Sequence, residues 1–230
     1  MATIKVMSGG APKEVFAHLT PEFEKRSGRK VEFSYAVMSA LRDRLAAGEK
    51  TDMLVMPVPL LDGYVKEGKL SADGRGVLGT VLISMVARQG GPQPDISTAD
   101  KFRQALLAAG SIVHATPGQT PSGTHLGKLM DALGIPKERI QHRPALAGGV
   151  ELVRSGSADL GIYPTSEVVN IEGLAVVGPL PGEAQLPQVY GVGVAADSAN
   201  AEAAKAFIAF LTAPERRAAW AAGGFEAAVR

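Results

Sequence analysis

The chain has 230 residues, of which 46% are hydrophobic and 20% are charged, enough apolar material for one large domain or for two lobes of about 100 residues each. The net charge is +1, the aromatic content is 5%, and basic residues are spread along the chain, so neither a nucleic acid nor a membrane surface is an expected partner. The sequence lacks cysteine and its histidines have no His-x-x-x-His spacing, so we expect no disulfide, no metal site and no cofactor.

Short apolar runs alternate with amphipathic stretches, which is typical of an α/β fold with a largely parallel sheet. The predicted strands are Ile4–Met7, Val31–Tyr35, Met53–Met56, Val81–Ala87, Ser111–Ala115, Leu160–Tyr163, Leu174–Val177 and Val189–Ala195. The predicted helices are Pro12–Arg26, Ser39–Ala47, Ala99–Ala109, Gly123–Leu133, Gly149–Arg154, Ala201–Leu211 and Pro214–Ala222. Pro21 is expected to kink the first helix or to restart it with Thr20 as the cap.

The N-terminus runs directly into the first predicted strand. No basic segment, apolar core or small-residue cleavage site precedes that strand, and no apolar stretch approaches the roughly 18 residues that span a bilayer. We therefore expect a soluble protein without membrane insertion. Its expected location is cytoplasmic as the sequence is written, and periplasmic if Met1 has replaced an export signal.

Two segments of the chain, 45–55 and 152–162, are alike. Each contains a helix end, a glycine, a short turn and an aspartate that opens a buried strand. This pattern is either ordinary punctuation between a helix and a strand or a sign of two lobes of related design. In the second interpretation Val81–Ala87 and Val189–Ala195 are the crossovers between the lobes, and the last two helices return to the first lobe.

Four predicted strand-to-helix transitions are rich in glycine and in small hydroxyl side chains. They are Ser8-Gly9-Gly10-Ala11, Ala36-Val37-Met38-Ser39, Gln119-Thr120-Pro121-Ser122-Gly123-Thr124-His125 and Ala147-Gly148-Gly149. A helix start exposes unpaired N–H groups and the positive end of the helix dipole, and glycine lets a ligand approach the backbone. Because ligands of open α/β sheets bind at the carboxyl ends of strands, several such loops facing one cleft would bind a small anion.

Each loop also has a purely structural interpretation. Ser8 and Ser39 are suited to cap helices, Gly9 and Gly10 to form a tight turn, and Ser122 or Thr124 to cap the following helix. The occurrence of four such loops in both halves of the chain favours a binding site. Arg42, one turn into the second helix, adds a guanidinium that would favour a carboxylate through a bidentate contact.

At these loops the chain resembles the periplasmic molybdate-binding family, within the type 2 substrate-binding proteins of ABC transporters. The resemblance rests on the order and spacing of the segments Ser8–Ala11, Pro21–Gly28, Gly48–Val55, Thr120–Thr124, Ser155–Tyr163 and Ala204–Phe225. It implies a two-lobed periplasmic-binding-protein type 2 fold in which each lobe is a mixed, mostly parallel sheet flanked by helices. Lobe I would comprise 1–82 and 195–230, lobe II 83–194, with two crossovers and a ligand cleft between the lobes.

The resemblance also implies oxyanion contacts at Ser8, at Ser39, within Ser122–Thr124, at the backbone near 148–149 and at Tyr163. The second loop differs from the family's Gly-Ser-Ser-Gly pattern, because it lacks a hydroxyl and contains Met38, which favours a small carboxylate over molybdate. The candidate ligand-binding residues are therefore Ser8, Gly9, Gly10, Ser39, Arg42, Ser122, Gly123, Thr124, Gly148, Gly149 and Tyr163.

We expect a monomeric solute-binding protein that captures a small anion, an oxyanion or a small carboxylate, and delivers it to an ABC permease. The alternative is an isomerase on the same scaffold that acts on an unsaturated di- or tricarboxylate, as aconitate isomerase does among the relatives of this group. Such a reaction needs a proton-transferring group and donors for an enolate-like oxyanion. Tyr163, His125 or a nearby serine is the candidate for proton transfer.

Overall fold

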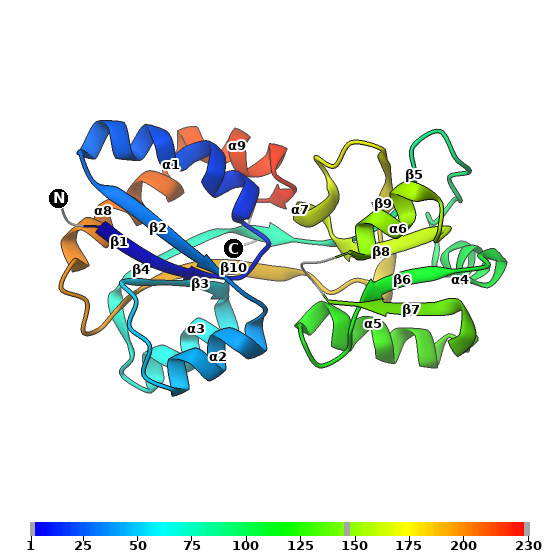
Figure 1. Cartoon of the computed structure of the whole chain (residues 1–230), viewed down its shortest axis with the longest axis horizontal. Coiled ribbons are helices and arrows are strands. Elements are labelled where there is room, and N and C mark those ends of the chain that lie inside the picture. Colours follow the sequence, from blue (N-terminus) through cyan, green and yellow to red (C-terminus); the bar gives the residue numbers. More distant parts are fainter. Residues whose placement is uncertain (1–2, 145–147, 228–230) are drawn as a thin grey trace. The chain divides into compact units, whose positions relative to one another are not determined.

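The computed structural model describes residues 3–144 and 148–227. The chain divides into two units, which are Met1–Val81 with Gln188–Arg230 (unit 1) and Leu82–Pro187 (unit 2). Each unit is built on its own mixed β-sheet with helices on both faces (Figure 1). The predicted α/β class is confirmed. The expectation of mostly parallel sheets is wrong, because among the described strands four pairings are parallel and five are antiparallel. Within the described ranges, no helix combines the length and apolarity needed to cross a bilayer.

The sheet of unit 1 has the strand order β11-β4-β10-β3-β1-β2. Its strands are β1 (Thr3–Ser8), β2 (Lys30–Tyr35), β3 (Met53–Pro57), β4 (Leu70–Val81), β10 (Gln188–Ala195) and β11 (Phe225–Glu226). β1 pairs in parallel with β2 and β3, whereas β10 runs antiparallel to β3 and β4. The helices are α1 (Lys13–Ser27), α2 (Met38–Ala46), α3 (Val58–Lys66), α8 (Ala201–Thr212), the 3-10 turn Pro214–Arg216 and α9 (Arg217–Ala222). In Figure 1, α1, α8 and α9 cover one face of this sheet and α2 and α3 cover the other.

The alternation of side chains along β1 creates two apolar layers in unit 1. Ile4 and Val6 belong to the core that contains Phe16 of α1 and Phe207 of α8, whereas Met7 packs on the opposite face under α2 and α3. Because helices cover both faces, most positions of the central strands are buried, and a strict alternation of apolar and polar residues is absent.

Helix α1 continues from Lys13 to Ser27 with Pro21 inside it. Of the two expected alternatives, a kink at Pro21 or a restart with Thr20 as the cap, the restart is therefore wrong. A proline in a helix removes one backbone hydrogen bond. The buried side chains of Phe16, Leu19 and Phe23 flank Pro21 on both sides and hold the helix on the sheet as one element.

The sheet of unit 2 has the strand order β7-β6-β8-β5-β9. Its strands are β5 (Ile83–Arg88), β6 (Ile112–Ala115), β7 (Ile140–Arg143), β8 (Leu160–Pro164) and β9 (Leu174–Pro179). β6 pairs in parallel with β7 and β8, and β5 is antiparallel to β8 and β9. The helices are α4 (Ala99–Ala108), α5 (Pro121–Ala132), α6 (Gly149–Ser155), α7 (Thr165–Val168) and the 3-10 turns Lys137–Arg139 and Gly182–Ala184.

The two passages of the chain between the units differ in detail from the prediction. The run Val81–Ala87 contains the end of β4 and the start of β5, which belong to different sheets and are separated only by Leu82. The return occurs at Pro187, before β10, whereas the sequence analysis places it at 194/195. The reason is that β10 pairs along its length with β3 and β4 in unit 1.

Candidate functional site

In unit 1 the carboxyl ends of the three parallel strands lie side by side. Ser8 of β1 is in register with Tyr35 of β2 and with Val55 of β3. Each strand leads into a helix, so the N-termini of α1, α2 and α3 open at the same edge of the sheet. None of these three helix starts has a side-chain cap. The N–H of Lys13 in α1 already donates to the carbonyl of Gly10, and Pro59 in α3 has no N–H. The helix dipoles and the remaining first-turn N–H groups are available to an acceptor such as an anion.

The first loop is held close to its neighbours by its backbone. Ser8 is fully buried, and its Oγ donates a 2.8 Å hydrogen bond to the carbonyl of Gly9. The N–H of Gly9 donates to the carbonyl of Val55 at 3.1 Å, and the N–H of Ala36 donates to the carbonyl of Ser8 at 3.2 Å. A Cβ atom at position 9 would lie 2.4 Å from Cε of Met38, so a larger residue there would require the Met38 side chain to move. The first and second loops therefore pack directly against each other. Gly10 follows, and its carbonyl accepts a 3.0 Å bond from the N–H of Lys13.

The second loop leaves one hydroxyl group available. Ser39 is the second residue of α2 and not its cap, which is Val37. The Ser39 side chain is partly buried and has no hydrogen-bond partner within the described part of the chain. Arg42 is exposed and lies near α3. Burial raises the pKa of Tyr64 in that helix, and the charge of Arg42 is among the opposing effects.

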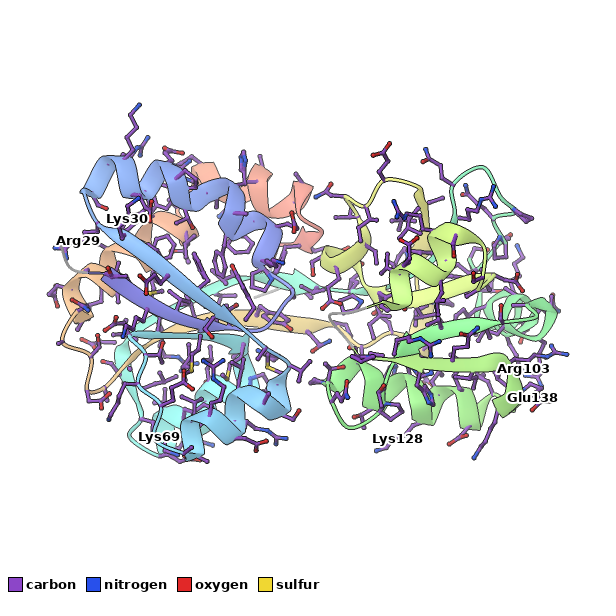
Figure 2. All side chains as sticks on the ribbon, in the orientation of Figure 1. Arg29, Lys30, Lys69, Arg103, Lys128 and Glu138 are labelled. Carbon is purple, nitrogen blue, oxygen red and sulfur yellow. The ribbon has the colours of Figure 1, made fainter. Side chains whose placement is uncertain are left out.

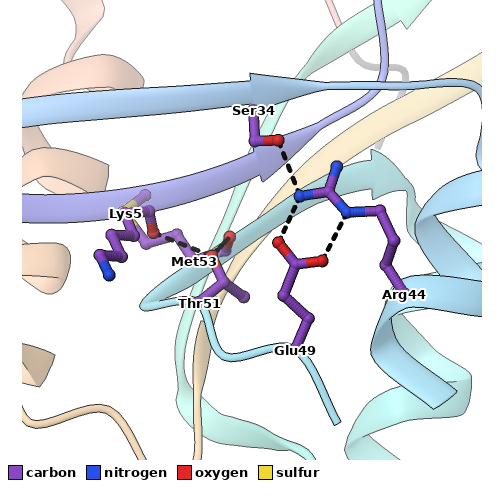
Figure 3. A network of polar contacts seen from close by, with 6 residues as sticks. All are labelled: Lys5, Ser34, Arg44, Glu49, Thr51 and Met53. Atoms are coloured by element: carbon purple, nitrogen blue, oxygen red, sulfur yellow. Dashed lines mark hydrogen bonds and ion pairs between the residues drawn. The ribbon is translucent and has the colours of Figure 1, made fainter. Parts of the chain in front are cut away.

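Helix α2 is anchored at the end opposite Ser39. The guanidinium of Arg44 donates to Oγ of Ser34 on β2 at 2.8 Å and, through Nε, to the carboxylate of Glu49 at 2.7 Å (Figure 3). In the same view, Oγ1 of Thr51 donates to the carbonyl groups of Lys5 and Met53. These contacts tie the helix and the turn before β3 to the parallel strands, and so hold the first turn of α2 in place.

In unit 2 the loop before α5 is capped by a residue that the sequence analysis did not choose. Thr120 is the cap, because its Oγ1 accepts from the N–H of Gly123 at 3.0 Å. Thr124 donates to the carbonyl of Thr120 and accepts from the N–H of Gly118, both at 3.0 Å, so its hydroxyl holds the loop. Ser122 is buried, and its Oγ lies 3.1 Å from Oγ1 of Thr120. Of the two predicted hydroxyls in this loop, that of Ser122 forms one hydrogen bond and that of Thr124 forms two.

The hydroxyl of Tyr163 lies at the start of α6. Tyr163 is 3% exposed on β8, and its hydroxyl has no hydrogen-bond partner among the residues that the structure describes. A Cβ atom on Gly149 would be 2.1 Å from this hydroxyl oxygen, so only glycine allows the close approach. Gly148, with φ of 81°, provides the left-handed turn into α6. Ala147, the first residue of the predicted loop, lies outside the described residues.

Two residues that follow Tyr163 closely in the chain were not among the predicted site residues. Ser166 is 4% exposed, and its hydroxyl also lacks a partner among the described residues. Glu167 is partly buried, forms no hydrogen bond or ion pair with the described residues, and has a pKa raised by burial to about 8. The only available signal in the sequence was their position directly after a predicted strand that ends in a candidate ligand residue.

The structure places His125 differently from the other candidates. Its Nε2 lies 2.8 Å from the carbonyl oxygen of Ala184, to which it donates. This contact directs the imidazole from α5 to the 3-10 turn Gly182–Ala184. Its proton is therefore engaged in a structural bond.

The candidate residues form two groups, one in each unit. Ser8, Gly9, Gly10 and Ser39 lie at the carboxyl edge of the first sheet. In unit 2, Ser122 and Gly149 lie in the first turns of α5 and α6, and Tyr163 lies near the end of β8. The lysines labelled in Figure 2, Lys30, Lys69 and Lys128, project outward and are exposed. In the described part of the chain, no three acidic or histidine side chains are grouped so as to hold a metal ion.

Comparisons with known proteins give consistent results. A family model described as "Bacterial extracellular solute-binding protein" matches residues 4–226. An aconitate isomerase from Pseudomonas sp. is 31% identical over 226 residues, which cover 94% of this chain and 84% of that protein. The molybdate-binding protein ModA of Mycobacterium bovis is 24% identical, over 97% of this chain and 84% of that protein.

A solved structure, the periplasmic molybdate-binding protein of Azotobacter vinelandii, superposes with a TM-score of 0.76 and 19% identity. The match covers 98% of this chain and 100% of that one. At this identity the superposition establishes the fold. The comparisons together confirm the resemblance seen in the sequence and the type 2 periplasmic-binding-protein fold that it implies.

Proposed function

Because the chain belongs to the family of bacterial extracellular solute-binding proteins, we propose that it captures a small anion. Strand-to-helix loops at the carboxyl ends of the strands would contact the ligand. An ABC permease is the proposed partner that receives the ligand. One observation carries the proposal: three helix starts without side-chain caps open at one sheet edge, and the Ser39 hydroxyl beside them has no hydrogen-bond partner among the described residues.

A small carboxylate is the ligand class that we favour over molybdate. Met38 covers Gly9 with its thioether, so part of the first-loop backbone faces an apolar group and not a ring of hydroxyls. A carboxylate with a carbon skeleton gains from such a contact, whereas a compact tetrahedral oxyanion does not. The identity of 31% with an aconitate isomerase supports the same class.

That identity also supports a second candidate function, the isomerisation of an unsaturated di- or tricarboxylate. Both functions use the same anion site. They differ in whether a proton is transferred to and from the bound ligand.

A panel of anions tests the proposed function directly. Molybdate, tungstate, sulfate, malonate, citrate and aconitate are each added to the protein, and the shift in Tm is measured. We expect the largest stabilisation from a di- or tricarboxylate, since a ligand that binds only the folded state raises its stability. If none of these anions raises Tm, the anion-binding function is wrong.

Replacing Ser39 by alanine is expected to weaken binding of the best anion of the panel about tenfold, or ~1.4 kcal/mol, because a hydrogen bond to a charged ligand is lost. Isothermal titration calorimetry measures the change in Kd. Ser27→Ala is the matched control, because Ser27 is exposed at the far end of α1 in the same unit. Equal affinities of the two variants would remove Ser39 from the site.

Replacing Tyr163 by phenylalanine is expected to separate stability from binding. The buried hydroxyl lacks a partner in the described structure, so its removal should raise the free energy of unfolding by about 1 kcal/mol. The affinity for the anion should fall about tenfold, because the same hydroxyl would donate to the ligand. Urea unfolding and calorimetry measure the two quantities. A variant that loses stability and keeps its affinity would show that the hydroxyl is structural.

A further inference from the structure

The end of β8 and the first turn of α7 carry an unusual concentration of unpartnered polar groups. Within five consecutive residues, Tyr163 and Ser166 have buried hydroxyls without a partner, and Glu167 has a carboxyl group without one, all judged against the described residues. Buried polar groups are nearly always hydrogen-bonded, and an unsatisfied one costs about 1–3 kcal/mol. A cluster of such groups therefore indicates an absent polar partner.

Glu167 is the chemically distinct member of this cluster. Burial raises the pKa of the Tyr163 phenol, and the negative charge of Glu167 raises it further. Helix α7 packs against β5, β8 and β9, where the titratable side chains are Arg88 and Tyr163. No cation forms an ion pair with the Glu167 carboxylate within the described residues. A carboxylic acid kept from cationic partners can act as both acid and base near neutral pH.

Glu167 also keeps part of its surface exposed. The residue as a whole is only partly buried, although burial of its carboxyl group raises the pKa. The other candidates lack one of these properties: His125 donates its Nε2 proton to Ala184, and burial raises the pKa of Tyr163 well above neutrality. Glu167 is thus the group that combines a free carboxyl with a position next to a candidate ligand residue.

We propose that Glu167 transfers protons to and from an unsaturated tricarboxylate whose carboxylate is held at Tyr163, an inference that rests on the proposed anion-binding function. The Glu167 carboxylate removes a proton from the allylic methylene carbon. The electrons of the broken C–H bond delocalise over the C=C bond and the adjacent carboxylate. The Glu167 carboxylic acid then returns the proton to the other end of the allylic system, and the double bond moves to the former methylene carbon. No oxidant, reductant or second substrate is consumed.

Deuterium exchange in aconitate tests this proposal. The wild-type protein, Glu167→Gln and Glu172→Gln are incubated with aconitate in D2O, and loss of the methylene and vinyl signals is followed by proton NMR. Glu172 is the control, because it is an exposed glutamate in the segment that follows α7. Calorimetry measures the binding of aconitate to each protein, and thermal unfolding shows that each is folded.

We expect all three proteins to bind aconitate with affinities within about threefold of one another. Exchange should occur with the wild type and with Glu172→Gln, and should be at least about 100-fold slower with Glu167→Gln. Undiminished exchange with Glu167→Gln overturns the proposal, and so does binding to the wild type without exchange. In both cases the anion-binding function stands. If no anion of the panel binds the wild type, the anion-binding function itself fails.

The pH dependence of exchange by the wild type is a second test that needs no variant. The base must be deprotonated, so the exchange rate at aconitate concentrations well below saturation should rise with pH through an apparent pKa near that of Glu167 in the free protein, about 8. A rate that is constant between about pH 6 and 9 contradicts the proposal.

Discussion

Replacement of Phe207 by alanine is expected to lower the free energy of unfolding by about 4 kcal/mol. Phe207 is fully buried on α8. Its ring lies 4.6 Å from that of Phe23 and within 6.5 Å of those of Phe16 and Phe33, so one side chain joins α1, α8 and β2. Alanine would remove its apolar contacts and leave a cavity that the helix and sheet cannot fully close.

Urea unfolding followed by tryptophan fluorescence measures this loss, because the single tryptophan, Trp220, lies in the same core. Val77→Ala is the control: Val77 is 50% exposed on β4, and its truncation should change stability by less than about 0.5 kcal/mol. A loss below about 1 kcal/mol for Phe207→Ala would contradict the packing described for unit 1.

Acidification is expected to destabilise the protein by about 3 kcal/mol through His114 alone. His114 is fully buried on β6, and its Nδ1 donates to the carbonyl of Ala115 at 2.9 Å, while Nε2 has no partner in the described residues. Burial lowers its pKa from 6.5 to about 4, against the opposing effect of that hydrogen bond, and His142 lowers it further. The contribution to stability is complete above pH 6.5 and is lost as the pH falls towards 4, because only the unfolded state binds the proton in this range.

The comparison of wild type with His114→Leu isolates this effect. One pKa unit corresponds to about 1.4 kcal/mol, so the difference in unfolding free energy between the two proteins should change by about 3 kcal/mol between pH 7.5 and pH 4. Carboxylates that titrate in the same range are present in both proteins and cancel. A difference that stays constant with pH would show that His114 does not enter the folded core as the neutral imidazole.

Much of the secondary structure is predictable because it depends on local patterns. The helix Ala99–Ala108, for example, starts after a threonine cap and shows a regular apolar face, and its predicted bounds agree within one residue. No strand is predicted between residues 70 and 80, where the structure has most of β4. There, Gly76 lies under α8: a Cβ atom would be 2.7 Å from Cγ2 of Ile208. Glycine is needed at position 76 because α8, which is far away in the sequence, packs closely against the strand there. The local sequence pattern does not reveal this contact.

The candidate site shows the same division. Its position at strand-to-helix loops follows from the sequence, since the order of apolar runs, glycines and hydroxyl residues is local information. The role of each hydroxyl does not follow from the sequence. The hydroxyls of Thr120 and Thr124 form hydrogen bonds within their loop, whereas those of Ser39 and Tyr163 have no partner among the described residues.

The sequence alone therefore determined the α/β class, most helices and strands, the loops that carry the candidate site and the resemblance to anion-binding proteins. The tertiary structure decided the return of the chain before β10, the engagement of His125 with Ala184 and the isolation of Glu167 beside Tyr163. The physical reason is the range of the interactions. Helix caps and periodic apolar faces join residues a few positions apart, whereas strand pairing, burial and the absence of a hydrogen-bond partner depend on segments that only folding brings together.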